Sequence, residues 1–166
     1  MKYYFLILGI CLLGGSATAQ VAIDKLTVNG SSALLDFPSG STKGIILPAV
    51  ATLPGTPANG TFLFDKNEAK VKMYQNGSWV ELSDEGDAAD VLPYNGTAKN
   101  TQTVMGDETT AVDGVLVLEA ADKAMILPKV ASPHLNVPKP YPGMMCYDTD
   151  AKALAVFDGS VWSYWK

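Results

Sequence analysis

Residues 71–82, with the sequence VKMYQNGSWVEL, decide the fold class of this chain. Asn76 and Gly77 are residue types that tolerate the positive φ of a two-residue hairpin turn. Such a turn aligns five cross-strand pairs: Gln75 with Ser78, Tyr74 with Trp79, Met73 with Val80, Lys72 with Glu81, and Val71 with Leu82. Side chains alternate along a strand, so the apolar pairs share one face, and the aromatic and charged pairs share the other. The sequence therefore predicts a β-hairpin with one buried face.

The segments around this hairpin occur twice in the same order. Four matches carry the repeat: ILPAVA at 46–51 with ILPKVA at 126–131, GTFLFD at 60–65 with GMMCYD at 143–148, Ala69-Lys70 with Ala151-Lys152, and NGSW at 76–79 with DGSVW at 158–162. A Pro-rich connector separates the first two segments in both copies. Ordered matches of this kind are typical of internal duplication. The extra Val161 implies either a longer loop or a shifted register in the second hairpin, and the sequence leaves both open.

We therefore expect an all-β fold made of two tandem copies of a small antiparallel β module, with short strands, hairpins and Pro-rich loops. Asn-Gly or Asp-Gly pairs mark the expected turns, at 29–30, 59–60, 76–77, 95–96, 113–114 and 158–159. Pro and Gly interrupt any helical period beyond the N-terminal segment, so a helix is expected only there. The expected division is residues 20–82 for the first copy, 83–100 for a linker and 101–166 for the second copy.

The linker begins with small and acidic residues, which favour a solvated segment. Its four carboxylates, Asp84, Glu85, Asp87 and Asp90, raise calcium binding as an alternative. Their spacing does not match an EF-hand loop, so we favour the solvated linker and expect no metal site.

The N-terminus has the pattern of a secretion signal. Lys2 precedes an apolar run that ends at Gly14-Gly15, and Ala17-Thr18-Ala19 is a small-x-small cleavage site. The run is shorter than the roughly 20 residues that span a bilayer. Acylation at Cys11 is the other alternative, but Ile10 is not the small residue that a lipoprotein signal places before its cysteine. We expect cleavage near Ala19 and a protein that is secreted, at the cell surface or in the periplasm.

Charge excludes several classes of partner. Loss of residues 1–19 would remove Lys2 and change the net charge from −5 to −6, and the chain contains no arginine. Arginine is the usual bidentate reader of phosphate and guanine. An acidic chain without arginine therefore argues against nucleic acids, nucleotides and anionic membrane surfaces. No segment of the mature chain is apolar enough to span a membrane.

The sequence offers no constellation for catalysis. His134 is the one histidine and has no neighbouring partner, so we interpret it as a loop or core-edge residue. Phosphate loops, nucleophile elbows and zinc-ligand spacings are missing, and nothing singles out a pair of carboxylates. Cys146 is the one cysteine beyond the signal, and its apolar surroundings favour burial over pairing between chains. We expect no enzyme, no cofactor and no metal.

Aromatic side chains are the remaining candidates for a binding or interface surface: Tyr74, Trp79, Phe157, Trp162, Tyr164 and Trp165. Exposed aromatic rings on a β-face stack on sugars or dock a partner. The alternative is that these rings fill a small core or a subunit interface, which is the commoner fate of large aromatics.

The repeated pattern resembles a module of secreted and cell-surface proteins of Bacteroidota, of the flavobacterial type, with no assigned activity. The residues that carry the resemblance are KGIILPAV at 43–50, GTFLFD at 60–65 and YQNGSWV at 74–80, with closer matches from Ala124 to Lys166. Similar modules occur in fibre-like proteins. The resemblance implies a β scaffold without a conserved site and, through the fibre-like relatives, a homotrimer.

Two functions follow as hypotheses. The leading one is a non-enzymatic structural module, secreted or at the cell surface, that associates with itself. The alternative is a glycan- or peptide-binding module of the adhesin kind, which uses the hairpin aromatics and requires Trp79 and Trp162 to be exposed. The expected partners are further copies of the chain, a cell-envelope protein or a glycan.

Overall fold

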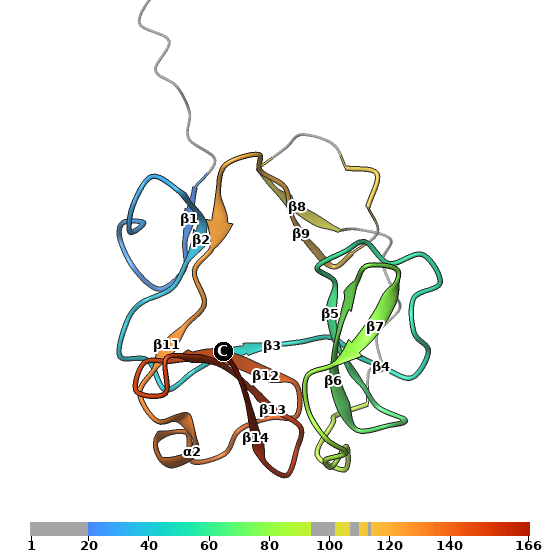
Figure 1. Cartoon of the computed structure of the whole chain (residues 1–166). Helices are drawn as coiled ribbons and strands as arrows, with labels where there is room; N and C mark the ends of the chain where they lie inside the picture. The colour runs from blue at the N-terminus through green and yellow to red at the C-terminus, as the bar shows by residue number, and fades with distance from the viewer. Residues whose placement is uncertain (1–19, 94–101, 107–109, 113) are drawn as a thin grey trace, which may run out of the picture.

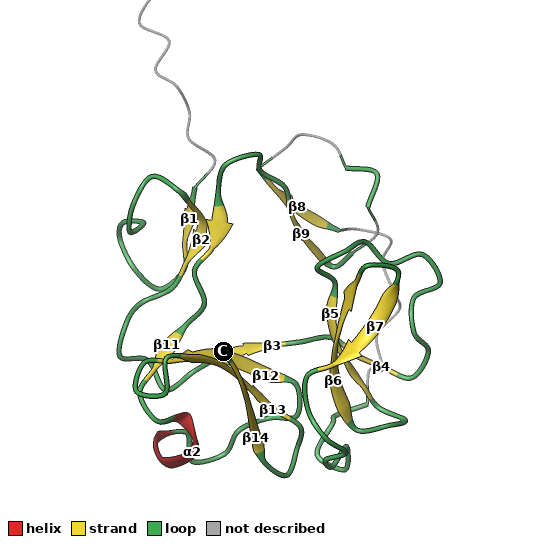
Figure 2. Ribbon diagram, viewed as in Figure 1, coloured by secondary structure: helices red, strands yellow, loops and turns green. Residues whose placement is uncertain are grey.

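The computed structural model describes residues 20–93, 102–106, 110–112 and 114–166 (Figure 1). Within these residues the chain forms short strands and one small helix, α2, so the fold is all-β (Figure 2). The expected signal peptide at 1–19 and the expected turn at 95–96 lie outside the described residues. No helix in the described part of the chain has the length and apolar character needed to cross a membrane.

The predicted hairpin is part of a four-stranded sheet. The strands, in spatial order, are β4 (Ala49–Val50), β5 (Phe62–Asp65), β6 (Lys70–Gln75) and β7 (Ser78–Glu81). Strands β6 and β7 have the predicted register from Gln75–Ser78 to Lys72–Glu81, and the N–H of Leu82 donates to the carbonyl of Val71 at 2.8 Å. Asn76 and Gly77 have φ values of 50° and 81°, as a type I′ turn requires. The hairpin prediction is confirmed.

A second sheet has the same strand order. It holds β11 (Lys129–Val130), β12 (Met144–Asp148), β13 (Ala153–Phe157) and β14 (Trp162–Trp165). Phe157 pairs with Trp162, so the turn contains the residues from Asp158 to Val161. The extra Val161 therefore lengthens the loop, and the aromatic pair stays in register with the Tyr74–Trp79 pair of the first sheet.

Register relates the two sheets residue by residue. Val50 pairs with Asp65 in the first sheet, and Val130 pairs with Asp148 in the second. Asp65 in turn pairs with Lys70, and Asp148 pairs with Ala153. The position that corresponds to Ala69 is therefore Lys152, and both residues have a positive φ, 50° and 54°. The sequence alignment of Ala69-Lys70 with Ala151-Lys152 is wrong by one residue, because backbone geometry in this turn is repeated while side-chain identity is not.

The two expected copies exchange strands. β3 (Ile45–Ile46), from the first range, pairs with β12 of the second sheet. β10 (Ala124–Met125), from the second range, pairs with β2 (Ala33–Asp36), which also pairs with β1 (Val21–Ala22). A separate pair holds β8 (Thr103–Met105) and β9 (Leu116–Leu118). Figure 1 shows β3 beside β12, although the two strands are far apart in the sequence.

Two fold expectations are wrong. The pairing is not purely antiparallel: β1–β2, β2–β10, β4–β5, β8–β9 and β11–β12 are parallel. The Pro-rich connectors explain two of these pairs, because they are long enough to carry the chain back to the start of the next strand, as a parallel pair requires. Helix is also not confined to the N-terminal segment, since α2 (Pro133–Asn136) forms in the second connector, with Pro133 in its first turn.

The core lies between the inner faces of the two sheets. Phe64 and Val71 of the first sheet pack with Met145 and Val156 of the second, and Leu82 completes this cluster with Leu47. The outer face of the second sheet holds another cluster, which includes Cys146, Ala155 and Phe157 and is covered by Val137 from the connector. The predicted buried face of the first hairpin is confirmed at Val71 and Leu82.

In the described part of the expected linker, the acidic side chains are solvated but much of the backbone is not. Asp84, Glu85, Asp87 and Asp90 are exposed, as predicted. The backbone instead joins the sheets: Gly86 N–H donates to Ala69 O at 2.9 Å, and Asp87 N–H donates to Asp158 O at 2.9 Å. Residues 83–91 therefore form a junction between the two hairpins, with Ala88 and Val91 packed on the core.

Candidate functional site

A groove of about 750 Å³ lies on the outer face of the second sheet, between α2 with its connector and the β13–β14 hairpin. Its walls combine rings, prolines and a few polar groups: His134, Val137, Pro138, Pro140, Asp148, Ala151, Phe157, Ser160, Val161, Trp162 and Tyr164. Phe157 and Trp162 are directly opposite each other on β13 and β14, and Tyr164 lies two residues after Trp162. Strand alternation therefore places all three side chains on this face.

Three of the six predicted aromatics meet in the groove. The rings of Phe157 and Trp162 lie 5.4 Å apart at 47°, and Trp162 is half-buried. Tyr164 is 39% exposed, and its hydroxyl lies 3.2 Å from Nδ1 of His134. The groove therefore presents both ring faces and hydrogen-bonding groups, as small-ligand sites do.

The other three predicted aromatics lie elsewhere. Tyr74 and Trp79 form an edge-on pair on the first sheet, with ring centroids 5.2 Å apart, and both are half-buried. Trp165 points to the opposite face of β14 from Tyr164 and donates its indole N–H to Leu82 O at 2.6 Å. Trp165 thus ties the second sheet to the end of the first hairpin, which is an interface role within one chain.

Asp148 is the buried charge of the groove, with 2% of its surface exposed. Its Oδ1 accepts hydrogen bonds from the backbone N–H groups of Ser132, Asp150 and Ala151. Burial alone raises the pKa of Asp148, but these hydrogen bonds outweigh burial, and the pKa falls below 3.8. Asp148 is therefore a carboxylate at neutral pH, and Oδ2 accepts no hydrogen bond from the described residues.

The charge of Asp148 affects its neighbours. Burial and the nearby Asp148 carboxylate raise the pKa of Tyr164, so its hydroxyl keeps its proton and can donate. Burial, helped by Asp148, raises the pKa of the Cys146 thiol to about 12. The prediction that Cys146 is buried is confirmed, and its high pKa makes it unreactive at neutral pH.

Sequence reasoning missed the roles of Asp148 and His134 in this site. Asp148 closes the repeated GMMCYD segment, and that recurrence was the available signal. His134 is on α2, where sequence reasoning placed a loop without partners, and it contacts Tyr164 thirty residues away. Only the connector's path over β14 brings these two residues together.

The described residues contain no group of three or more His, Cys, Asp or Glu side chains placed to hold a metal ion. Comparison of the chain with family models, with curated proteins and with solved structures gives no match.

Proposed function

We propose that this chain is an exported, non-enzymatic binding module that presents the groove of its second sheet to a ligand of the cell envelope. The observation that carries the proposal is the convergence of the half-buried Trp162, the exposed Tyr164 and the carboxylate of Asp148 on one groove, with the buried Phe157 in its wall. Three of the exposed large apolar residues, Leu135, Val161 and Tyr164, lie on the connector and the hairpin that form the groove walls. Exposed apolar surface around a groove is typical of interaction sites.

We further infer that the two sheets descend from one duplicated scaffold. Their shared strand order, their matched register at Asp65 and Asp148, and their aromatic hairpin pairs support this inference. The Bacteroidota resemblance and the secretion-type N-terminus support export to the cell exterior. Duplication lets one copy serve as scaffold while the other acquires a ligand site.

The state of the polar groups favours binding over catalysis. Three backbone N–H groups hold Oδ1 of Asp148, and His134 Nδ1 lies within hydrogen-bond distance of the Tyr164 hydroxyl. A general base needs a nucleophile or a substrate proton within reach, and these contacts are structural.

Binding screens of the mature chain test this proposal. Arrays of envelope glycans and of peptides are probed with the wild type, and any hit is measured by tryptophan fluorescence. Trp162→Ala is expected to lower affinity about tenfold or more, as loss of a stacking aromatic does. Trp79→Ala is the matched control, because it removes the corresponding ring of the first sheet. Equal losses in the two variants, or silence on both arrays, would contradict a site in the groove.

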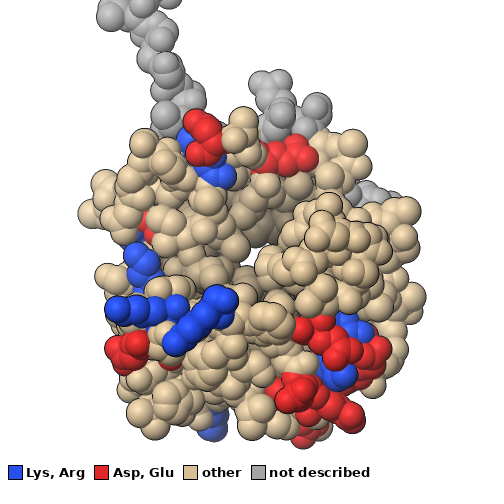
Figure 3. Space-filling view, viewed as in Figure 1, with Lys and Arg blue, Asp and Glu red and all other residues tan. Residues whose placement is uncertain are grey.

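Self-association is a second candidate function. β7 and β14 each lie at the edge of their sheet, and unpaired edges are templates for another chain. In the view of Figure 3 the largest group of basic side chains lies at the left, and the largest group of acidic ones lies at lower right with basic side chains among them. Patches of opposite sign suit contact between copies. Sedimentation is expected to show an oligomer, with a trimer as the form that the fibre-like relatives imply. A compact monomer at high concentration would remove this candidate.

A further inference from the structure

We propose that the groove of the second sheet receives a primary ammonium group, the end of a lysine side chain of a peptide or protein partner. This inference rests on the proposed binding function and names its ligand class. It depends on a comparison within the chain, because the first sheet holds a lysine of its own at the corresponding place.

Lys72 is that internal lysine. It lies on β6, on the outer face of the first sheet, and only 4% of it is exposed. Its Nζ lies 2.8 Å from Oδ2 of Asp65 and 2.9 Å from Oε1 of Glu68. Asp65 also accepts hydrogen bonds at Oδ1 from the N–H groups of Asn67 and Glu68. The turn between β5 and β6 therefore shows how this module holds an ammonium group. One oxygen of Asp65 accepts hydrogen bonds from the backbone, and the other binds Nζ of Lys72.

The second sheet keeps the aspartate and lacks the lysine. Register places Asp148 at the position of Asp65 and Ala155 at the position of Lys72. The position of Glu68, three residues after the aspartate, is Ala151. Oδ1 of Asp148 binds the turn backbone just as Oδ1 of Asp65 does. Asp65 pairs with Lys72, whereas no lysine among the described residues pairs with Asp148, and His134 is the side chain whose charge lowers the pKa of Asp148.

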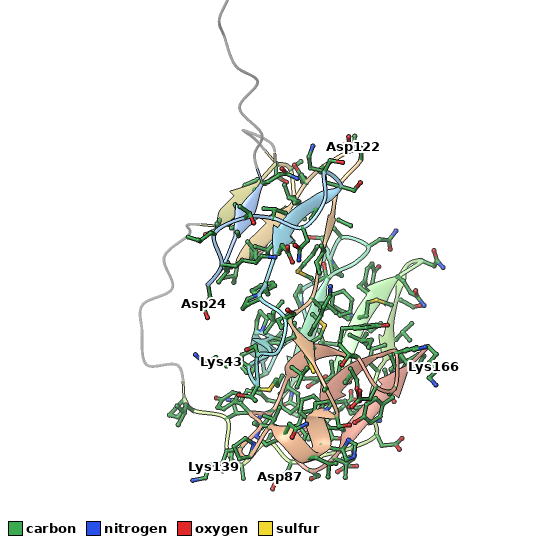
Figure 4. The ribbon with its side chains drawn as sticks, turned by 90° about the vertical axis from the view of Figure 1, so that its left-hand side faces the viewer. Asp24, Lys43, Asp87, Asp122, Lys139 and Lys166 are labelled. Carbon is green, nitrogen blue, oxygen red and sulfur yellow. The ribbon has the colours of Figure 1, made fainter. Side chains whose placement is uncertain are left out.

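Asp148 and Ala151 both line the groove. The two positions whose counterparts hold Nζ of Lys72 therefore face an open space that a ligand can enter. No lysine is among the described residues that line this space, and Figure 4 shows Lys139, between the two lining prolines, pointing away from the body of the protein.

The rest of the groove suits the stem of a lysine. Trp162, Tyr164 and Phe157 offer apolar contact for the methylene groups, and an ammonium group within about 6 Å of a ring face gains cation–π attraction. Three backbone N–H groups hold Oδ1 of Asp148, and Oδ2 accepts no hydrogen bond from the described residues, so a ligand donor can reach it. A cation there gains a charge-assisted hydrogen bond, whereas a neutral sugar gains a weaker one. An anion would be repelled. An ammonium group neutralises Asp148, as the ammonium group of Lys72 neutralises Asp65 in the first sheet.

The test is a titration of the mature protein, followed by NMR and by tryptophan fluorescence. The probe is the peptide acetyl-Gly-Lys-Gly-amide, with the same peptide carrying Nε-acetyl-lysine or norleucine as controls for charge. Saturable shifts at Trp162 and Tyr164 are expected with the lysine peptide, and binding of the two controls is expected to be about tenfold weaker, since charge-assisted hydrogen bonds are the strong ones.

Variants sharpen the test. Ala151→Glu restores the second carboxylate of the first sheet, and we expect about a tenfold gain in affinity for the lysine peptide. Ala151→Gln has the same size without the charge, and we expect it to bind the lysine peptide about tenfold more weakly than Ala151→Glu does. Asp148→Asn keeps the oxygen that accepts the backbone N–H groups, and we expect about a tenfold loss or more. The comparison of Ala151→Glu with Ala151→Gln measures the effect of charge on the affinity for lysine even if Asp148→Asn folds poorly.

Each other outcome has a definite reading. Equal binding of the lysine and acetyl-lysine peptides, or equal effects of Ala151→Glu and Ala151→Gln, overturns the ammonium site. Binding of methyl glucoside in the groove without lysine binding also overturns it but leaves the proposed function standing. Silence toward all peptides and sugars removes both. Concentration-dependent association that Asp148→Asn abolishes would show that a second copy supplies the lysine, and a foreign peptide partner would be wrong.

Discussion

Lys72 is the residue that most distinguishes this structure from its sequence pattern. The hairpin register places Lys72 opposite Glu81, and this pairing predicts a cross-strand ion pair. Lys72 instead pairs with Asp65 and Glu68, while Glu81 pairs diagonally with Lys70 at 2.8 Å. Strand alternation predicted the face correctly. The choice of partner depends on Asp65, which β5 brings close and which no local pattern identifies.

Removal of the Lys72 ammonium is therefore expected to destabilise the fold strongly. Lys72→Met leaves the Asp65 carboxylate buried and unpaired, and we expect the free energy of unfolding to fall by about 3 kcal/mol. The measurement is urea unfolding followed by tryptophan fluorescence. Lys70→Met is the control, because its partner Glu81 is half exposed and the pair is solvated. A Lys72→Met variant as stable as the control would contradict the role given to the buried pair.

The same pair sets a pH window for stability. Burial opposes both charges, but the hydrogen bonds between the partners prevail, so the pKa of Asp65 lies below 3.8 and that of Lys72 lies above 10.5. A lowered carboxyl pKa stabilises the fold above 3.8, and this contribution is lost as the pH falls through the folded-state pKa. A raised lysine pKa stabilises it below 10.5, and this contribution is lost as the pH rises through the folded-state pKa.

Thermal unfolding across pH checks this expectation. The melting temperature should fall at both ends, and in Lys72→Met the alkaline fall should become shallower. Asp36 and Asp148 also have a lowered pKa, so the acid fall should persist in that variant. An unchanged alkaline arm in Lys72→Met would count against a folded-state shift at this lysine.

At the scale of elements, the two hairpin turns look alike in sequence and differ in surroundings. Gly77 and Gly159 both have a positive φ, 81° and 100°. A Cβ added at Gly77 would meet nothing within 4 Å, whereas a Cβ at Gly159 would overlap the carbonyl of Asp87. The second turn is therefore packed under the junction segment, and the first turn is free.

Alanine substitutions separate these two situations. Gly77→Ala is expected to lower the free energy of unfolding by about 1 kcal/mol through backbone strain alone. Gly159→Ala adds a collision with backbone to that strain, and we expect a loss of about 3 kcal/mol or more. Chemical denaturation of both variants measures the difference. Equal losses would show that the junction segment does not pack on the second turn in solution.

For the whole molecule, strand exchange decides how the chain folds. β3 completes the second sheet, β10 pairs with β2, and the core residues Phe64 and Val156 come from opposite halves of the chain. Two modules with separate cores would unfold independently. Here the two sheets share one core, and strands from opposite halves of the chain pair in the second sheet and in the β1–β2–β10 sheet, so the halves are expected to unfold together.

Single-tryptophan variants test this cooperativity. One variant keeps Trp79 in the first sheet and another keeps Trp162 in the second, with the remaining tryptophans replaced by phenylalanine. In each variant the remaining tryptophan is expected to report a single transition in urea. Calorimetry of the same variant is expected to give an enthalpy equal to the van't Hoff enthalpy, as two-state unfolding requires. A segment spanning residues 83–166, without β3 and the first sheet, is expected to lack a cooperative transition. Folding of that segment alone would show that the halves are independent.

The sequence by itself determined the all-β class, the first hairpin with its register, and the burial of Cys146. These features follow from local chemistry: Asn-Gly supplies the turn, alternation assigns the faces, and an apolar string buries its thiol. The repeat left the register of the second hairpin open, and the structure assigned Val161 to the loop and paired Trp162 with Phe157.

Only the tertiary structure decided which strands pair across the two halves, how the connector covers β14, and that Asp148 faces an open groove while Asp65 faces Lys72. Each of these depends on residues that are far apart in the chain and meet only when the shared core forms. One residue difference illustrates the point, because Ala155 in place of Lys72 is an unremarkable apolar residue in the sequence. In the structure it leaves Asp148 without the lysine that Asp65 has, and the proposed ammonium site rests on that difference.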